Sequence, residues 1–202
     1  MAELTDGYHD LPPQKIAALV TLLEMHEPPP QRPVDPPPGV TLERPEPIDL
    51  DRYLALYRRI GLDWLWFSRL RLSRDDLAAI LTDPAVELWY LRRGCDDLGL
   101  LELDRRHHPD VELAFFGLAP DLVGTTAGRF LMNHAIQRAF APGPCRFWVH
   151  TCSLDHPKAL AFYVRSGFTP YARALEIADD PRLTGDLPAD AAPWLPLVEV
   201  CT

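Results

Sequence analysis

The chain has 202 residues, which suits one domain with a single sizeable core. Its 47% hydrophobic and 24% charged content are close to the averages for globular proteins, and no stretch approaches the roughly 18 uncharged apolar residues that a membrane helix requires. A net charge of -9 argues against nucleic acid or anionic lipid as partners, because phosphate contacts need clustered Lys and Arg.

The amino-terminal residues MAELTDGYHDLPP carry neither the basic start nor the apolar run of a secretory signal, so we expect a cytoplasmic protein. The cysteines form no CxxC pair, which favours reduced, isolated thiols over a disulfide framework or a zinc site. The four are Cys95, Cys145, Cys152 and Cys201. A group of arginines can be a solvated face or a patch that attracts an anion. These are Arg58, Arg59, Arg69, Arg71 and Arg74.

Residues 14–25 carry Ile16, Leu19, Val20 and Leu23 at helical spacing, which predicts a short amphipathic helix. Residues 28–39, PPPQRPVDPPPG, are too rich in proline for a helix or a central strand and predict a stiff spacer. We therefore expect residues 1–27 to be a helical appendage that docks on the domain or on a second subunit, which makes a homodimer plausible.

Alternating strands and helices follow the spacer. Residues 40–44 read as a strand, and residues 50–60 as a helix that Asp49 caps and Gly61 ends. Ser73 caps a second helix that ends before Asp83-Pro84. Periodicity and turn residues then predict strands over 86–91, 98–104, 111–118, 147–152 and 169–177, and helices over 124–140 and 157–165. Residues 178–202 are weakly patterned and predict an extension that lies over the surface.

This order of elements, over roughly residues 40–177, resembles the GNAT N-acetyltransferase family. Two blocks carry the resemblance: VELAFFGLAPDLVGTTAGRFLMNHAI and HTCSLDHPKALAFYVRSGF. The resemblance implies an α/β (α+β) fold with a mixed central sheet flanked by helices. It also implies an enzyme that moves an acetyl group from acetyl-CoA to a primary amine of a small molecule or peptide, by direct attack in a ternary complex.

Small residues surround the start of the long helix predicted over 124–140. Free backbone N–H groups and the positive end of a helix dipole suit a diphosphate, and small residues let it approach. A helix start with no ligand is the alternative. The resemblance places the coenzyme diphosphate on Val123, Gly124, Thr125, Thr126, Ala127, Gly128 and Arg129. The family has Arg or Gln where Val123 stands and Gly where Thr126 stands, so only Gly128 matches its pattern outright.

The strand before this loop has a further role by resemblance. Backbone groups of Phe116, Gly117 and Leu118 are expected to pair with the pantetheine arm of the coenzyme. Gly117 fits a close backbone approach, although a glycine within a strand also marks a plain bulge.

The resemblance also assigns the chemistry. Glu112 stands where several members carry a glutamate base, and its apolar surroundings should raise its pKa; Glu102 is the next candidate. Tyr163 matches the tyrosine that protonates the coenzyme thiolate, with a packed aromatic as the alternative. His156 stands where many members have a coenzyme-binding Asn, and it can instead cap the following helix.

Substrate selection in this family comes largely from the segment between the first two helices, here GLDWLWFSRL. Aromatic clusters mostly bury themselves, so about two of Trp64, Trp66 and Phe67 should be core. We expect Trp64 and Phe67 as substrate-binding candidates, with Asp63, Glu102 or Glu112 holding the positive charge of a flat or apolar amine.

His107 and His108 lie near Asp104 and Asp110, but no third ligand has recognisable spacing, so we predict no metal site. An alternative function belongs to another class. A GNAT-like domain can hold an acyl-CoA, or no coenzyme, and act as a regulatory module rather than as an enzyme.

Overall fold

The computed structural model describes residues 5–30, 32–143 and 146–198. These residues form a mixed seven-stranded sheet in the order β2-β3-β4-β5-β6-β1-β7, in which β5 and β6 are parallel neighbours and the other pairs are antiparallel. The strands are β1 (Lys15–Met25), β2 (Val40–Glu43), β3 (Val86–Arg93), β4 (Asp96–Asp104), β5 (Asp110–Leu118), β6 (Arg146–Cys152) and β7 (Thr169–Asp179). The α-helices are α1 (Leu50–Gly61), α2 (Arg74–Leu81), α3 (Ala127–Phe140) and α4 (Ala159–Arg165), and the short 3-10 helices are η1 (Leu62–Trp64), η2 (Ser68–Arg71) and η3 (Pro120–Leu122).

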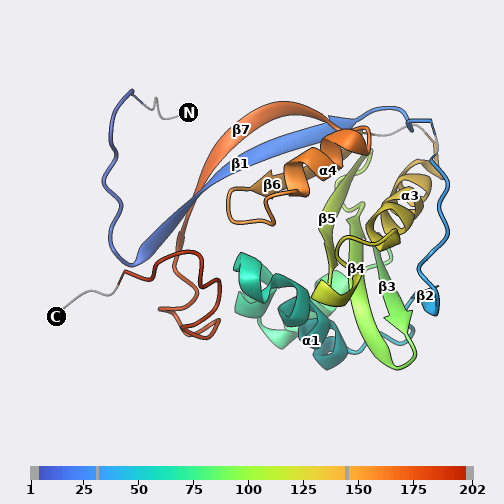
Figure 1. Cartoon of the computed structure of the whole chain (residues 1–202), viewed down its shortest axis with the longest axis horizontal. Helices are drawn as coiled ribbons and strands as arrows, with labels where there is room; N and C mark the ends of the chain where they lie inside the picture. Colours follow the sequence, from blue (N-terminus) through green and yellow to red (C-terminus); the bar gives the residue numbers. More distant parts are fainter. Residues whose placement is uncertain (1–4, 31, 144–145, 199–202) are drawn as a thin grey trace.

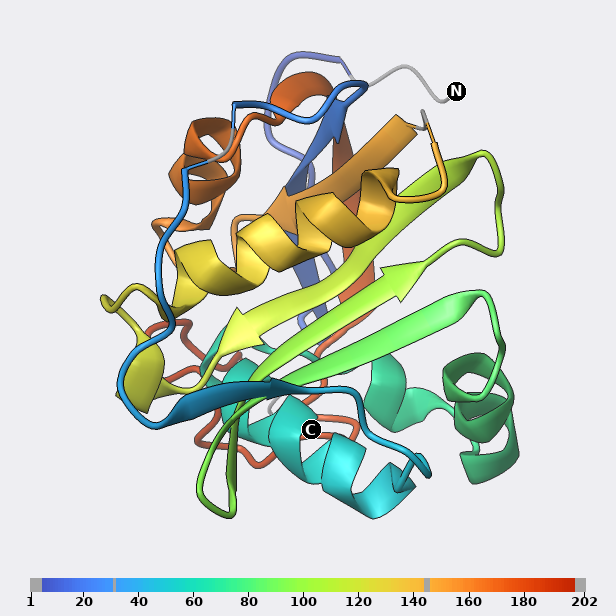
Figure 2. The same ribbon diagram turned by 90° about the vertical axis from the view of Figure 1, so that its right-hand side faces the viewer.

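Helices cover both faces of this sheet, as the expected fold class requires. Helices α3 and α4 lie on one face, and α1 and α2 lie on the other (Figures 1 and 2). Leu131 of α3 is buried in a core with Phe147 of β6. On the opposite face, Tyr53 of α1 and Leu77 of α2 are buried with Leu100 of β4. Two cores therefore hold the sheet between its helices.

The two early helices begin where the sequence predicts. The Asp49 side chain accepts hydrogen bonds from the N–H groups of Asp51 and Arg52, and Ser73 accepts one from Asp76. These caps satisfy N–H groups that have no partner within a helix. The helix predicted to end at Gly61 does so.

The helix predicted over residues 14–25 is wrong, because residues 15–25 form β1. This strand lies inside the sheet and pairs with β6 on one side and with β7 on the other. Ala18 and Leu23 are buried in cores on different faces. Strand β1 is apolar at most positions, including Ala17 and Leu19, which are exposed, so its sequence lacks the alternation typical of a strand and resembles a helical pattern. Residues 1–27 are therefore not a helical appendage, and the reason for expecting a homodimer is removed.

The proline-rich segment, residues 28–39, connects β1 to β2 and runs past α3 (Figure 2). Two side chains of the α3 region hold its backbone. Thr126 Oγ1 donates to the carbonyl of Asp35 at 3.0 Å, and Asn133 Nδ2 donates to the carbonyl of Arg32 at 2.9 Å. The spacer is therefore packed along this helix.

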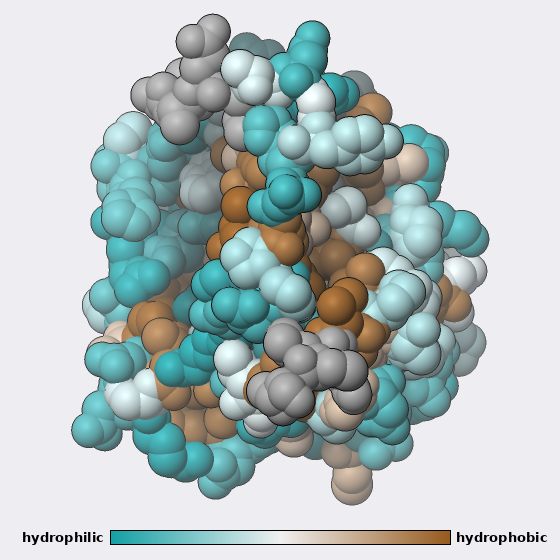
Figure 3. Space-filling view, turned by 90° about the vertical axis from the view of Figure 1, so that its left-hand side faces the viewer, coloured by the Kyte–Doolittle hydropathy of each residue, from teal (hydrophilic) through white to brown (hydrophobic). Residues whose placement is uncertain are grey.

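The C-terminal extension, residues 180–198 of the described chain, is more than the surface covering predicted. Leu187 and Ala192 are buried against Leu65, in a third and smaller core. Other side chains of the extension, such as Leu183 and Trp194, remain exposed. Apolar and hydrophilic side chains are interspersed on the face that carries the extension, with apolar ones gathered near its middle (Figure 3).

Helix α3 begins three residues later than predicted, because Gly124 has φ +82°, outside the helical region. Helix α4 likewise begins at Ala159 instead of Pro157.

Cys95 and Cys152 are free thiols, whereas Cys145 and Cys201 lie outside the described residues. Among the described helices, none is long and apolar enough to cross a membrane.

Two leucines of β1 provide a matched test of the strand assignment. Leu23 is fully buried, whereas Leu19 is 54% exposed. We expect Leu23→Ala to lower the free energy of unfolding by about 2–5 kcal/mol, through lost burial and a cavity. Leu19→Ala should change it by less than about 0.5 kcal/mol. Chemical denaturation measures both. Equal effects would contradict the placement of β1 within the sheet.

Candidate active site

Strands β5 and β6 diverge after a short parallel contact. They pair only over Asp110–Glu112 and Arg146–Trp148. Beyond that point β5 continues beside β4, and β6 continues beside β1. The register of β4 and β5 also shifts at Ala114, where a bulge increases the local twist. The divergence leaves one edge of β5 facing a cavity of about 1340 Å³.

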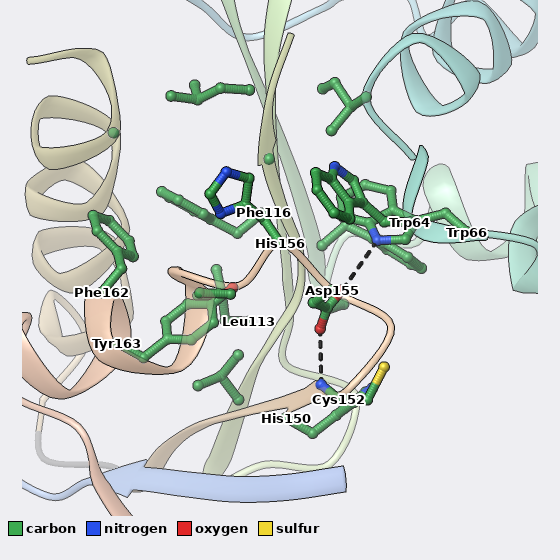
Figure 4. A pocket seen from close by; sticks show the side chains of 18 of the residues that line it. Trp64, Trp66, Leu113, Phe116, His150, Cys152, Asp155, His156, Phe162 and Tyr163 are labelled. Atoms are coloured by element: carbon green, nitrogen blue, oxygen red, sulfur yellow. Dashed lines mark hydrogen bonds between the residues drawn. The ribbon is translucent and has the colours of Figure 1, made fainter. Parts of the chain in front are cut away.

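Most of the predicted site residues line this cavity. They come from β5, the entrance of α3, the α1–α2 connection and the region of α4. The lining includes Trp64, Phe67, Glu112, Phe116, Gly117, Leu118, Val123, Gly124, Thr125, Thr126, Gly128, Arg129, His156 and Tyr163. Figure 4 shows Phe162 and Tyr163 on one side of the pocket and Trp64 and Trp66 on the other, with Phe116 and His156 between them.

The entrance of α3 presents several free amides. Among the described residues, the N–H groups of Gly124, Thr126, Gly128 and Arg129 have no hydrogen-bond partner. The N–H of Ala127 differs, because it donates to Thr125 Oγ1 at 3.2 Å and the residue is fully buried. The cluster of free amides at the positive end of a helix fits a diphosphate, and Ala127 drops out of the predicted set.

Threonine at position 126 does not strain the backbone at the entrance of α3. Thr126 has φ −72°, which any L-residue adopts, and only Gly124 needs a positive φ. The hydroxyl of Thr126 is directed to Asp35 of the proline-rich segment, and the hydroxyl of Thr125 donates to the carbonyl of Leu122. Neither hydroxyl is left unpaired. A glycine at position 126 is therefore not required by the backbone of this chain.

Glu112 lies at the point where β5 and β6 part. Burial raises the pKa of its carboxyl, partly opposed by the nearby His150, whose Nδ1 is 3.8 Å from Glu112 Oε1. A carboxylate with a raised pKa is a better proton acceptor near neutral pH. The position of Glu112 on the cavity wall is compatible with a base.

Glu102, the other predicted acid, does not reach the cavity. It is fully buried, accepts a 2.8 Å hydrogen bond from the Tyr53 hydroxyl and forms an ion pair with Arg69. Its side chain therefore ties α1 and η2 to the sheet. The prediction that Glu102 binds the acceptor or acts as the base is wrong. Its side chain points from β4 towards α1 and is buried in the core, away from the cavity.

Tyr163 lies in α4 with its ring against Phe116 and Phe168. Its packing matches the alternative interpretation, yet the residue also lines the cavity. Burial raises the pKa of its hydroxyl well above the usual value, so the group is protonated at neutral pH. Within the described chain its hydroxyl has no hydrogen-bond partner. A neutral phenol in this place can donate a hydrogen bond to a group in the cavity.

Packing alone explains why residue 117 is a glycine. A Cβ at this position would collide with Cγ2 of Ile60 and lie 2.9 Å from the Trp66 ring. A Cβ at Gly61 would also collide with Trp66. The two glycines form a slot for this indole, whose Nε1 donates to Asp155 Oδ1 at 3.4 Å. Gly117 therefore permits α1 and Trp66 to pack on β5.

The other two aromatics of this segment lie nearer the open cavity. The Trp64 ring meets the ring of His156 edge-on at 5.0 Å, and the guanidinium of Arg71 lies 4.1 Å from the centre of the Phe67 ring. His156 Nδ1 also accepts from the N–H of Lys158 at 3.0 Å, which closes the turn before α4; the N-cap of this helix, Lys158, has no side-chain cap.

Sequence reasoning missed Asp155 and His150. Asp155 Oδ2 accepts from the Thr151 hydroxyl and from the N–H of Cys152, and so shapes the turn between β6 and α4. His150 is on the same strand face as Trp148, which pairs with Glu112. The period-2 pattern of residues 146–152 gives this face, but only the register of β5 and β6 places it at the cavity.

Charge is segregated along the cavity. Near α3 and α4 it is lined by Arg129, Lys158 and Arg165, none of which has an ion-pair partner among the described residues. Three other lining arginines, Arg59, Arg69 and Arg106, are paired with Asp121, Glu102 and Asp104. The opposite end carries carboxylates without a cationic Lys or Arg partner in the described chain. These include Asp63, Glu112 and Glu176; Asp155 also lines the cavity without such a partner.

The family model for the Acetyltransferase (GNAT) family matches residues 53–168, more than half of the chain. The chain belongs to this family. The match covers α1 to α4 and the strands on both sides of the cavity, so the diverging strands are the family's acetyltransferase core. No curated protein matches the chain.

Several solved structures share the fold of this chain at low sequence identity. A GCN5-related N-acetyltransferase from Sphaerobacter thermophilus has a TM-score of 0.59 and 13% identity, over 81% of this chain and 52% of that one. One from Kribbella flavida has a TM-score of 0.54 and 18% identity, over 85% and 63%. The ribosomal-protein-S18-alanine N-acetyltransferase from Escherichia coli has a TM-score of 0.54 and 17% identity, over 68% and 90%. The chain thus spans only about half to two thirds of the first two.

The described residues contain no group of three or more His, Cys, Asp or Glu side chains that could hold a metal ion. Asp104 instead pairs with Arg106 at 2.6 Å, and Asp110 pairs with Arg146 at 3.0 Å. These carboxylates are engaged in the ion pairs of the GNAT domain.

Two glycines of the site provide a second test. We expect Gly117→Ala to lower the free energy of unfolding by about 1–3 kcal/mol, because the new methyl group displaces Ile60 and Trp66. Gly128→Ala is the control, since its Cβ would only make contacts of 3.6 Å with Leu118 and Phe162. Thermal unfolding measures the difference. A Gly117→Ala variant as stable as Gly128→Ala would contradict the slot for Trp66.

Proposed function

We propose that the chain is an N-acetyltransferase that transfers an acetyl group from acetyl-CoA to a primary amine. The observation that carries this proposal is the cavity at the divergence of β5 and β6, with free amides at one end and Glu112 and Tyr163 on its walls. Family membership supports the reaction class. A regulatory GNAT-like module remains the competing function, and coenzyme binding and turnover distinguish the two.

The coenzyme would lie along the free edge of β5. The backbone of Phe116, Gly117 and Leu118 would pair with the pantetheine arm as an added strand does, and the amides from Gly124 to Arg129 would hold the diphosphate. Val123, which is half exposed, supplies no charge there. Arg129, Lys158 and Arg165 would provide the positive charge that an Arg at position 123 would otherwise contribute, and His156 would contact the coenzyme beside them.

Acetyl-CoA supplies an acyl carbon activated as a thioester. Glu112 would accept a proton from the attacking ammonium or amine, directly or through a water molecule, so that the nitrogen lone pair can form the new C–N bond. Tyr163 would donate its proton to the sulfur as the C–S bond breaks. The phenol is then reprotonated from solvent and Glu112 releases its proton, which returns both groups to their starting state.

The acceptor would enter from the acidic end of the cavity. Trp64 and Phe67 offer flat apolar surfaces, and Asp63, Glu112 and Glu176 favour a positively charged amine over an anionic one. We therefore propose a small-molecule or peptide amine with an apolar or flat part next to the reacting nitrogen. The cationic residues at the opposite end, Arg129, Lys158 and Arg165, would bind the negatively charged part of the coenzyme.

Coenzyme binding is the first test. At a concentration 100 times its Kd, acetyl-CoA should stabilise the protein by roughly 2.7 kcal/mol, measured by thermal unfolding. CoA without the acetyl group should do nearly the same, because the diphosphate amides hold both. Absence of any shift at millimolar coenzyme would contradict the enzyme and leave a domain that binds no coenzyme. A shift without release of free thiol across a panel of amines and peptides would favour the regulatory module.

Glu112→Gln and Tyr163→Phe should each lower kcat by about 10²–10⁴-fold and leave stabilisation by acetyl-CoA unchanged. Because Glu112 must be ionised to act, kcat/KM for the amine should fall as pH drops through its pKa. Burial raises that pKa, so the midpoint should lie above the ordinary glutamate value. Glu112→Gln should remove this acidic limb.

His150→Gln is the control for this assignment, since His150 Nδ1 lies 3.8 Å from Glu112 Oε1 and imidazole is itself a possible base. An acidic limb that persists in Glu112→Gln and disappears in His150→Gln would move the base to His150. Wild-type rates in Glu112→Gln and Tyr163→Phe would contradict both roles.

A further inference from the structure

The C-terminal extension is organised by a buried ion pair. Arg182 donates to Asp180 at 2.7 Å, and both side chains are almost completely buried. The remaining donors of the guanidinium reach the carbonyls of Leu195 at 2.7 Å and Ala191 at 3.4 Å. One arginine thus closes residues 180–195 into a compact loop, because breaking its bonds would leave a buried charge unpaired.

This loop lies beside the connection between α1 and α2 (Figure 1) and is attached to it at two places. Arg71 Nε donates to Asp186 Oδ2 at 2.7 Å, and Trp194 Nε1 donates to the carbonyl of Asp63 at 2.7 Å. Between them, Leu65 is buried in the third core. The residues of the extension that share this core are Leu187, Ala191 and Ala192.

The attached connection has an unusual backbone. Leu65 is in the left-handed region, with φ 52° and ψ 43°, which a bulky L-residue rarely adopts. Such a conformation persists only where the surroundings hold it. Here the extension holds it from both sides, by burying the Leu65 side chain and by binding the carbonyl of Asp63.

The turn at Leu65 separates the two neighbouring indoles. Trp66 enters the slot between Gly61 and Gly117, whereas Trp64 lies against His156, and both of these rings line the cavity (Figure 4). The ring of Trp194 lies 6.4 Å from that of Trp64, on the extension. Trp64 is therefore placed between the extension and the turn that leads into α4.

We propose that residues 180–198 support the wall at the acceptor end of the cavity from outside, and that Trp194 is a positioning residue that fixes Trp64 through the Asp63 carbonyl. The position of Trp64 against His156 sets the width of the opening through which an amine enters. Trp194 itself does not line the cavity. The part that concerns the acceptor rests on the proposed function; the positioning of Asp63–Leu65 does not.

The positioning is tested first, without any ligand. We expect backbone hydrogen exchange of residues 62–67 to be at least about tenfold faster in Trp194→Ala than in the wild type. Trp194→Phe removes the N–H donor and keeps an aromatic ring, so it should give a smaller increase in exchange. If Trp194→Ala does not fold, Trp194→Phe alone tests the positioning. Leu183→Ala is the control, because Leu183 is an exposed side chain of the same extension. Unchanged exchange in Trp194→Phe and Trp194→Ala, or the same increase in Leu183→Ala, would overturn the proposal.

Kinetics test the consequence for the acceptor. Trp194→Ala should change the KM for the amine by about tenfold, with kcat and the KM for acetyl-CoA within about twofold of wild type. If Trp194 acts through Trp64, the double variant Trp64→Ala/Trp194→Ala should match Trp64→Ala alone. Additive effects, or equal changes in both KM values, would overturn this part. If the wild type acetylates no amine, the proposed function fails, and the exchange result still decides whether Trp194 fixes this wall.

Discussion

The cavity depends on a conflict of pairing at the centre of the sheet. Strand β5 follows the antiparallel β4, and β6 follows the antiparallel β1, so the parallel contact between β5 and β6 ends at Glu112 and Trp148. Backbone groups of β5 beyond this point have no strand partner on that side. Buried amides and carbonyls without partners are costly, so an extended ligand can take the place of the missing strand. The same divergence puts Glu112 at the apex of the cavity.

The opposite wall is held by packing and by a buried charge. Trp66 lies between two glycines, which brings α1 close to β5, and Glu102 binds both Tyr53 and Arg69 below it. Removing one member of that network would leave a charge buried without compensation. The segment that carries Trp64 and Phe67 is therefore anchored at its base by the sheet and, at its outer turn, by the C-terminal extension.

The family match at residues 53–168 leaves out parts of the chain on which the site depends. Strand β1 pairs with β6 from Phe147 to Cys152, and β7 pairs with β1 from Lys15 to Glu24. The proline-rich segment lies against the entrance of α3 through Thr126, and the extension lies against Asp63. Segments from both ends of the chain thus surround a core of the GNAT type.

The sequence alone determined the helix caps at Asp49 and Ser73, the meander from β3 to β5, the fold class and most of the cavity lining, because these follow from local patterns and two contiguous blocks. It could not place residues 15–25, since their apolar run continues through exposed positions such as Leu19 and so has no period that separates strand from helix. Nor could it separate Glu102 from Glu112, which differ in burial through strand register. Only tertiary packing, which joins residues far apart in the chain, decided the roles of β1, Glu102 and Trp194.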